Sequence, residues 1–174
     1  MSTRITLEVV GIKEALRDIN KVSPTLRRQI TKDFKEIVAP VVNDAKQRNP
    51  QEPPLSGFTR NWTTKSGLAM FPWDSKKSDR GIAAGTSGKK PRLYNGMTQN
   101  LSAFFVRWRG PQSTLFEMGT KGNLGRNLNI KHGFPGRIIW KSWDAHENQV
   151  MRNVSELVDG IMKAADKAQR SLRK

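Results

Sequence analysis

The side chains best suited to catalysis in this sequence are two histidines, His132 and His146, and the isolated carboxylate of Glu117. A general base needs a neighbour that orients and activates it, and the sequence around His132 and Glu117 offers none. Asp144, His146 and Glu147 lie close together, but the first and third share a helical face that His146 does not, so a metal site is not indicated. The sequence predicts a surface histidine at His146 and a structural ion pair at Glu117.

Cofactor motifs are equally weak. Residues 119–122 (Gly-Thr-Lys-Gly) look like a phosphate-binding loop, but they lack the glycine spacing and the flanking strand and helix of a Walker motif. The chain has no cysteine, which excludes a thiolate metal site, a cysteine nucleophile and a disulfide framework. We therefore expect no catalytic residue, no metal and no cofactor, in a protein that is not an enzyme.

Charge is the strongest chemical signal. The 174 residues carry a formal net charge of +16, and residues 49–136 hold 13 basic against four acidic side chains. A charge this large favours contact with nucleic acid or with an acidic protein surface. We expect such contacts first at Lys76, Lys77, Lys89, Lys90 and Arg92, and second at Arg107, Arg109, Lys121 and Arg126.

Aromatic side chains lie among these cations, an arrangement that suits base stacking together with phosphate neutralisation. No nucleic-acid recognition motif is present, so a contact with DNA would be directed at the backbone and independent of sequence. Aromatic residues are also enriched in protein interfaces, and we favour that interpretation. The expected subunit-interface residues are Trp62, Trp73, Tyr94, Trp140 and Trp143.

Hydrophobic periodicity predicts both strands and helices. The expected strands span residues 4–10, 81–85, 101–109 and 114–118. The expected helices span residues 12–20, 24–48 and 137–172. Pro40 should kink the second helix, because proline has no N–H to donate to the carbonyl of Glu36. The glycine-rich residues 119–136 are expected to form a basic loop.

The length fits one domain spanning residues 1–174. A hydrophobic content of 36% is low for a self-sufficient globule, so we expect part of the burial to be completed against partners. Residues 50–100 show no strong period and are rich in glycine and proline, which predicts either a loop that contains short strands, with residues 81–85 as one candidate, or an arm that orders on assembly. The expected fold is α+β, with a small antiparallel sheet packed against two long helices and a basic Gly/Pro-rich arm.

Targeting signals are not evident. Residues 1–10 do not combine a basic start with a long apolar run, so no signal peptide is expected. No apolar run approaches the roughly 20 residues that span a bilayer. We expect a soluble protein that acts in a reducing compartment or in something assembled there.

The order of several short motifs resembles the small neck and tail-completion (head–tail joining) proteins of long-tailed bacteriophages, the lambdoid tail-component family. The resemblance covers residues 4–60 and 113–165. The motifs that carry it are Val38-Ala39-Pro40-Val41-Val42, Ser56-Gly57, Phe116-Glu117-Met118-Gly119-Thr120, and Phe134-Pro135 leading into Ile138-Ile139 and Asp144.

This resemblance implies a structural virion protein at the head–tail interface, assembled in the cytoplasm of a host bacterium. Such subunits form a ring, here of six- or twelve-fold symmetry, that joins the head connector to the tail around the DNA exit channel. The implied partners are identical copies, head-connector and tail-tube or terminator proteins, and double-stranded genomic DNA, with no membrane. The alternatives are a tail terminator that caps the tail tube, or a sequence-independent nucleic-acid-binding protein.

Overall fold

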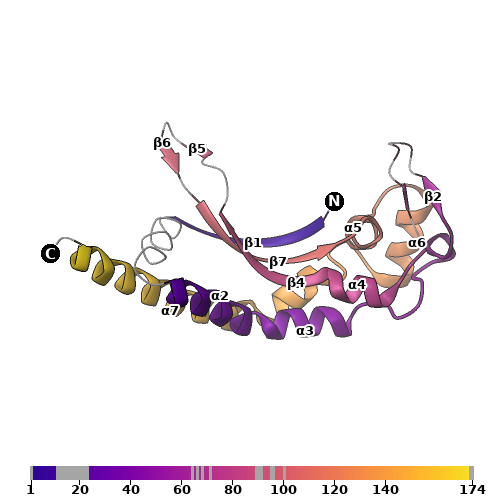
Figure 1. Ribbon diagram of the computed structural model, residues 1–174. Helices are drawn as coiled ribbons and strands as arrows, with labels where there is room; N and C mark the ends of the chain where they lie inside the picture. Colours follow the sequence, from indigo (N-terminus) through magenta and orange to yellow (C-terminus); the bar gives the residue numbers. More distant parts are fainter. Residues whose placement is uncertain are drawn as a thin grey trace. The chain divides into compact units, whose positions relative to one another are not determined.

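The computed structural model is a mixed helix and strand protein (Figure 1). It describes residues 2–10, 24–63, 65, 67, 69–70, 72–88, 92–94, 97–99 and 101–172. The helices are α2 (Pro24–Ile37), α3 (Ala39–Gln47), α4 (Ser75–Gly81), α5 (Pro111–Met118), α6 (Gly122–His132) and α7 (Ile139–Leu172), with a short 3-10 helix, η1, at Ser56–Thr59. The strands are β1 (Ser2–Val10), β2 (Trp62–Thr63), β3 (Ala69–Met70), β4 (Ile82–Gly88), β5 (Arg92–Tyr94), β6 (Met97–Gln99) and β7 (Leu101–Arg109).

The chain divides into two compact units, each assembled from segments that are far apart in sequence. Unit 1 consists of Met1–Ile5, Pro40–Ala83 and Val106–His146. Unit 2 consists of Thr6–Ala39, Ala84–Phe105 and Glu147–Lys174. The polar and aromatic clusters described below belong to unit 1.

The strands form a sheet in the order β1–β7–β4 and two antiparallel pairs, β2–β3 and β5–β6. The predicted strands at residues 4–10 and 101–109 are present as β1 and β7. In β4, a Cβ atom on Gly85 would lie 2.9 Å from the Phe105 ring, so glycine lets that ring approach the strand backbone. The general prediction of helices combined with antiparallel strands is confirmed.

Pro40 interrupts the predicted helix over residues 24–48. The chain forms α2 and α3 instead, separated at Val38, whose N–H still donates to the Phe34 carbonyl at 3.1 Å. Because Pro40 has no N–H, the bond that would continue the helix past Glu36 is missing. The apolar stripe keeps its spacing across the break, and its buried members are Ile30, Phe34, Val38, Val41 and Ala45.

α7 is the longest helix, with 34 residues, and it begins within two residues of the predicted start. Beyond its first turns, the buried residues of α7 lie four or seven positions apart, which is one or two helical turns and places them on one apolar stripe. They are Val150, Val154, Ile161 and Ala165.

Two predictions between β7 and α7 are wrong. Residues 114–118, expected as a strand, belong to α5, which has Pro111 at its start and buries Ser113, Phe116 and Glu117 at helical spacing. Residues 119–136, expected as a loop, contain α6. There Gly125 packs against backbone, since a Cβ would lie only 2.1 Å from the Thr120 carbonyl carbon. This glycine marks close packing rather than a loop.

The predicted arm is folded in its first part. Phe58, Met70, Trp73 and Ile82 are all buried, and residues 75–81 form α4. The prediction of an arm is therefore wrong for residues 50–83. Their apolar side chains are too irregularly spaced to show a period, yet they reach a common core. The predicted helix at residues 12–20 and the candidate contacts Lys89 and Lys90 lie outside the described residues.

Two glycines provide opposite tests of this packing. Gly125→Ala should lower the free energy of unfolding by at least about 2 kcal/mol, because the new methyl group meets fixed backbone at Thr120. Gly160→Ala, on an exposed part of α7 with nothing within 4 Å, should raise it by about 1 kcal/mol. Urea denaturation measures both changes. Equal effects of the two substitutions would contradict the close packing assigned to Gly125.

Candidate functional site

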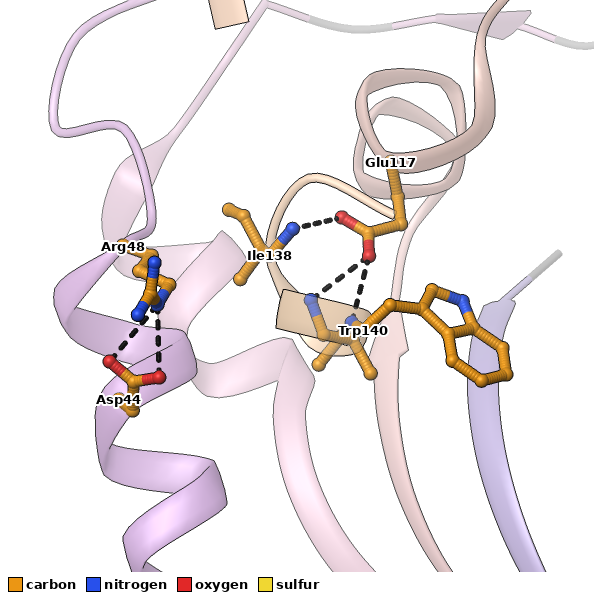
Figure 2. Close-up of polar contacts among 6 residues, drawn as sticks. Asp44, Arg48, Glu117, Ile138 and Trp140 are labelled. Carbon is orange, nitrogen blue, oxygen red and sulfur yellow. Dashed lines mark hydrogen bonds and ion pairs between the residues drawn. The ribbon is translucent and has the colours of Figure 1, made fainter. Parts of the chain in front are cut away.

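The buried carboxylate of Glu117 lies at the end of α5 and is directed at the start of α7 (Figure 2). Its Oε2 accepts the N–H of Ile138 at 2.7 Å. Its Oε1 accepts the N–H of Ile139 at 2.9 Å and, more weakly, that of Trp140 at 3.4 Å. The first N–H groups of a helix have no partner within it, so Glu117 caps α7 from a different helix. The sequence predicted a structural ion pair at Glu117; its hydrogen-bond partners are instead the backbone N–H groups at the start of α7, so its structural role is that of a helix cap.

Burial sets the charge state of this carboxylate. Desolvation raises the pKa of Glu117 above its ordinary range. The three backbone N–H donors and the guanidinium of Arg137 oppose that rise, because each favours the ionised form. Burial in turn lowers the pKa of Arg137, and the nearby Glu117 charge opposes that change.

Arg137 is the second buried charge of this cluster, and it is bonded mainly to backbone carbonyls. Its Nη1 donates to the carbonyls of Phe116 and Glu117, the latter at 3.2 Å. Its Nη2 donates to the Gly119 carbonyl at 3.0 Å and to Asn129 Oδ1 at 2.6 Å, and its Nε to the Gly133 carbonyl at 2.8 Å. A cation at the carboxyl end of α5 also complements the helix dipole. Arg137 therefore ties α5, α6 and the following turn together.

These contacts determine what the cluster can do chemically. Both carboxylate oxygens of Glu117 accept backbone N–H groups, and the residue is fully buried. The guanidinium of Arg137 uses all three of its nitrogens on neighbouring backbone and on Asn129. We call this arrangement the Glu117–Arg137 node, and it serves to hold helices in place.

His132 is part of the same packing. Its ring lies edge-on to Phe116, with centroids 5.1 Å apart, and its Nε2 is 3.1 Å from the Pro54 carbonyl oxygen. Lys131 Nζ donates to that same oxygen at 3.0 Å. These contacts fasten residue 54 to α6. Within the described ranges, no group of three or more His, Cys, Asp or Glu side chains is placed to hold a metal ion.

A second polar network, which the sequence did not reveal, joins the end of α3 to α4 and β7. The amide of buried Asn49 donates to Asp79 Oδ1 at 2.6 Å, and its Oδ1 accepts the Ser78 hydroxyl at 2.9 Å. Trp108 Nε1 donates to Ser78 Oγ at 3.0 Å. The side-chain amide of Asn49, the hydroxyl of Ser78 and the indole N–H of Trp108 each have a hydrogen-bond partner in this network, as burial requires. No spacing rule links positions 49, 78 and 108, so only the fold could show it.

Edge-on aromatic rings form the centre of unit 1. Trp73 contacts Phe58, Trp108 and Phe116 at centroid distances of 5.8, 6.3 and 5.9 Å. Its Nε1 donates to the Pro50 carbonyl at 2.9 Å. Such pairs add stability beyond area burial alone.

This packing bears on the predicted interface residues. Trp73 and Trp143 are buried within the chain, so the subunit core accounts for them without a partner. Trp140 is 41% exposed and Trp62 is half-buried, so both remain candidates. Tyr94 lies in β5 and also remains a prediction.

The predicted basic contacts are dispersed, with one exception. Lys76 and Lys77 are exposed on α4, Arg92 lies in β5, and Arg107 and Arg109 lie in β7. Lys121 and Arg126 are exposed before and on α6.

The exception is a cleft of about 300 Å³ in unit 1, lined by both Lys77 and Arg109 together with Trp73, Asp74 and Gln112. The carboxylate of Asp74 accepts the Lys77 N–H at 2.9 Å, which holds the pKa of Asp74 below its ordinary value. It also lies 3.4 Å from Lys77 Nζ. Asp74 thus partly neutralises Lys77, and Arg109 adds a second positive charge to the cleft.

Comparisons with protein-family models, with curated proteins and with solved structures found no match to this chain. None of the described helices is both long enough and apolar enough to cross a membrane.

Removing the Glu117 carboxylate should be costly. Glu117→Ala leaves the first N–H groups of α7 without their acceptor and removes the negative charge that favours the buried Arg137 cation, so we expect a loss of about 3 kcal/mol in unfolding free energy. Glu36→Ala removes a carboxylate that is 66% exposed and paired only with Lys32, and should change stability little. Denaturant titration followed by circular dichroism compares the two. A loss no larger for Glu117→Ala than for Glu36→Ala would show that the cap contributes little.

The raised pKa of Glu117 predicts a pH dependence with a definite sign. A carboxyl whose pKa is higher in the folded state than in the unfolded state, near 4.3, binds its proton more tightly when folded. Protonation of this carboxyl therefore adds stability to the folded state that is fully present below about pH 4 and is lost as the pH rises through the folded-state pKa. The stability of the wild type relative to Glu117→Gln should therefore fall over that interval in urea denaturation at stepped pH. A difference that is flat or increases with pH would contradict the assignment.

Proposed function

We propose that this chain is a structural virion protein of the head–tail junction, a neck or tail-completion subunit. In this proposal identical copies form a ring around the DNA exit channel, and the ring joins the head connector to the tail. The stretch that carries Lys89, Lys90 and Arg92 reaches neighbouring subunits or DNA.

The observation that carries the proposal is the meeting of two motifs. Residues 116–120 and residues 134–144 carry the resemblance to the phage family, and they are separate in sequence. Glu117 accepts the N–H groups of Ile138 and Ile139, and the Gly136 N–H donates to the Glu117 carbonyl at 2.9 Å. A motif pair whose residues bond to each other is a structural signature, which supports a scaffold role rather than a catalytic one.

The surface supports the same role. Several large apolar side chains are exposed in a chain of net charge +16, the combination expected of a subunit that buries apolar surface against neighbours near DNA. Among the described residues, Lys77 and Arg109 are two predicted basic contacts that line one cleft. Two cations in one cleft suit the binding of a DNA backbone phosphate.

Deleting the gene that encodes this chain, and then examining the particles that assemble without it, distinguishes the proposed role from its alternatives. A neck or tail-completion subunit predicts filled heads and tails of normal length that fail to join, as seen by negative-stain electron microscopy. Tails of uncontrolled length would identify a tail terminator instead. Intact, joined particles would rule out both virion roles and leave a free nucleic-acid-binding protein.

DNA contact at the cleft can be tested separately. Lys77→Glu combined with Arg109→Glu should weaken binding to a random-sequence duplex by about tenfold or more and reduce the slope of log K against log salt by about 2. Lys32→Glu combined with Lys35→Glu on α2 makes the same change in net charge and should have a smaller effect. Fluorescence anisotropy over a range of salt concentrations measures both. Equal losses would place the contact elsewhere.

A further inference from the structure

The cleft in unit 1 lies at the start of α5, where the usual side-chain cap is missing. A polar side chain at the N-cap position normally accepts one of the first N–H groups of a helix. In α5 that position is Gly110, and no side-chain hydrogen bond caps the helix. The φ of Gly110 is 120°, a backbone conformation that L side chains rarely adopt, so glycine fits there and a capping residue does not. The start of α5 can therefore bind an acceptor from another molecule.

Ser113, the third residue of α5, is a buried donor in the wall of this cleft. Its side chain lines the cleft although the residue is only 3% exposed. Its hydroxyl forms no hydrogen bond with another described residue, and its N–H belongs to the uncapped first turn. Because buried polar groups are normally hydrogen-bonded, an unpartnered hydroxyl at this position indicates a ligand that accepts a hydrogen bond from it.

Among the described residues, two cations and one acid line the same cleft. Arg109 is exposed directly before Gly110, and it forms no ion pair with another described residue. Lys77 is shared with Asp74, whose carboxylate already accepts the Lys77 N–H at 2.9 Å. Two positive charges thus face one negative charge, and the start of α5 adds the positive end of its helix dipole. The cleft favours a negatively charged ligand.

Packing holds the two cations on either side of the cleft. Trp108 Nε1 donates to Ser78 Oγ at 3.0 Å. This bond joins the residue before Arg109 to the residue after Lys77. A Cβ atom on Gly81 would lie 2.7 Å from the Arg109 carbonyl oxygen, so the end of α4 packs directly on the Arg109 backbone. Donors fixed in this way lose little conformational entropy when a ligand binds.

We propose that this cleft is a phosphate site, in which the oxygens of the ligand replace the missing cap of α5. Its donors come from three elements: Ser113 on α5, Arg109 at the end of β7 and Lys77 on α4. A tetrahedral phosphate presents oxygens in several directions, whereas a carboxylate presents two in one plane, and phosphates bind readily at helix N-termini.

The cleft volume of about 300 Å³ leaves room for a substituent on the phosphate, so an ester can enter. In the head–tail junction, the role on which this inference rests for the source of its ligand, the phosphate belongs to the DNA backbone.

Titration with inorganic phosphate tests the site directly. In isothermal titration calorimetry at constant ionic strength, Ser113→Ala and Arg109→Gln should each weaken phosphate binding by about tenfold, the cost of one hydrogen bond to a charged ligand. In the wild type, phosphate should shift the amide NMR signals of residues 109–114. Chloride at the same ionic strength should leave those signals unchanged.

Matched controls separate the site from general effects of charge and folding. Ser142→Ala removes another fully buried serine hydroxyl, on α7, and Arg152→Gln removes an exposed arginine of the same helix. Neither residue lines the cleft. Both controls should bind phosphate like the wild type, with circular dichroism confirming that every variant is folded.

Competition identifies the source of the phosphate. Saturating inorganic phosphate should release a random-sequence DNA duplex from the wild type more than chloride of equal ionic strength does, and this excess should be lost in Ser113→Ala. A duplex that phosphate does not displace, together with a thymidine 5′-monophosphate that binds more tightly than inorganic phosphate, would support the phosphate site but reject DNA as its source.

The site is refuted if phosphate causes no more change than chloride, or if Ser113→Ala and Arg109→Gln bind phosphate like the two controls. That result leaves the junction role standing when particles without the gene still have unjoined heads and tails. Conversely, phosphate binding by a chain whose deletion leaves intact particles rejects the junction role alone.

Discussion

The interaction on which unit 1 depends is the burial of one carboxylate and one guanidinium that bond chiefly to backbone. An ionised group removed from water is costly unless its hydrogen-bonding capacity is used, and here it is used on both sides. Glu117 takes the free N–H groups that begin α7, and Arg137 takes the carbonyls around the end of α5. Two helix ends that would otherwise carry unpaired polar groups are thereby satisfied together. These hydrogen bonds fix the direction in which α7 starts.

The aromatic cluster and the Asn49 network make the rest of unit 1 possible. Trp73 connects a long, proline-rich segment to β7 and α5 through ring contacts and one bond to the Pro50 carbonyl. Ser78 links Asn49 to Trp108, so the irregular segment is attached by polar as well as apolar contacts. A chain with a modest hydrophobic content thus builds a core by concentrating large rings in one place.

Prediction from the sequence succeeded where a period extends over several turns or a full strand. β1, β7 and the course of α7 followed from such patterns, whereas the helix expected over residues 24–48 is divided into α2 and α3 beside Pro40. It failed at α5, where eight residues are too few to distinguish alternation from helical spacing, and at α6, where glycines that allow close packing were taken as loop residues. The place of Trp73 in the core could not be predicted, because its ring partners come from three separate segments. For Glu117 a structural role was predicted, but its partners are backbone groups, which no side-chain pattern reveals.

The division of the chain into two units has a practical consequence for spectroscopy. All five tryptophans, at positions 62, 73, 108, 140 and 143, fall in unit 1, while the single tyrosine, Tyr94, falls in unit 2. Excitation at the red edge of the indole band therefore reports on unit 1 alone, and the edge-on Trp73–Trp108 pair should dominate its near-ultraviolet dichroism. Far-ultraviolet dichroism is weighted toward α7, most of which lies in unit 2. Melting curves recorded in the two wavelength ranges will coincide only if both units unfold in one cooperative step.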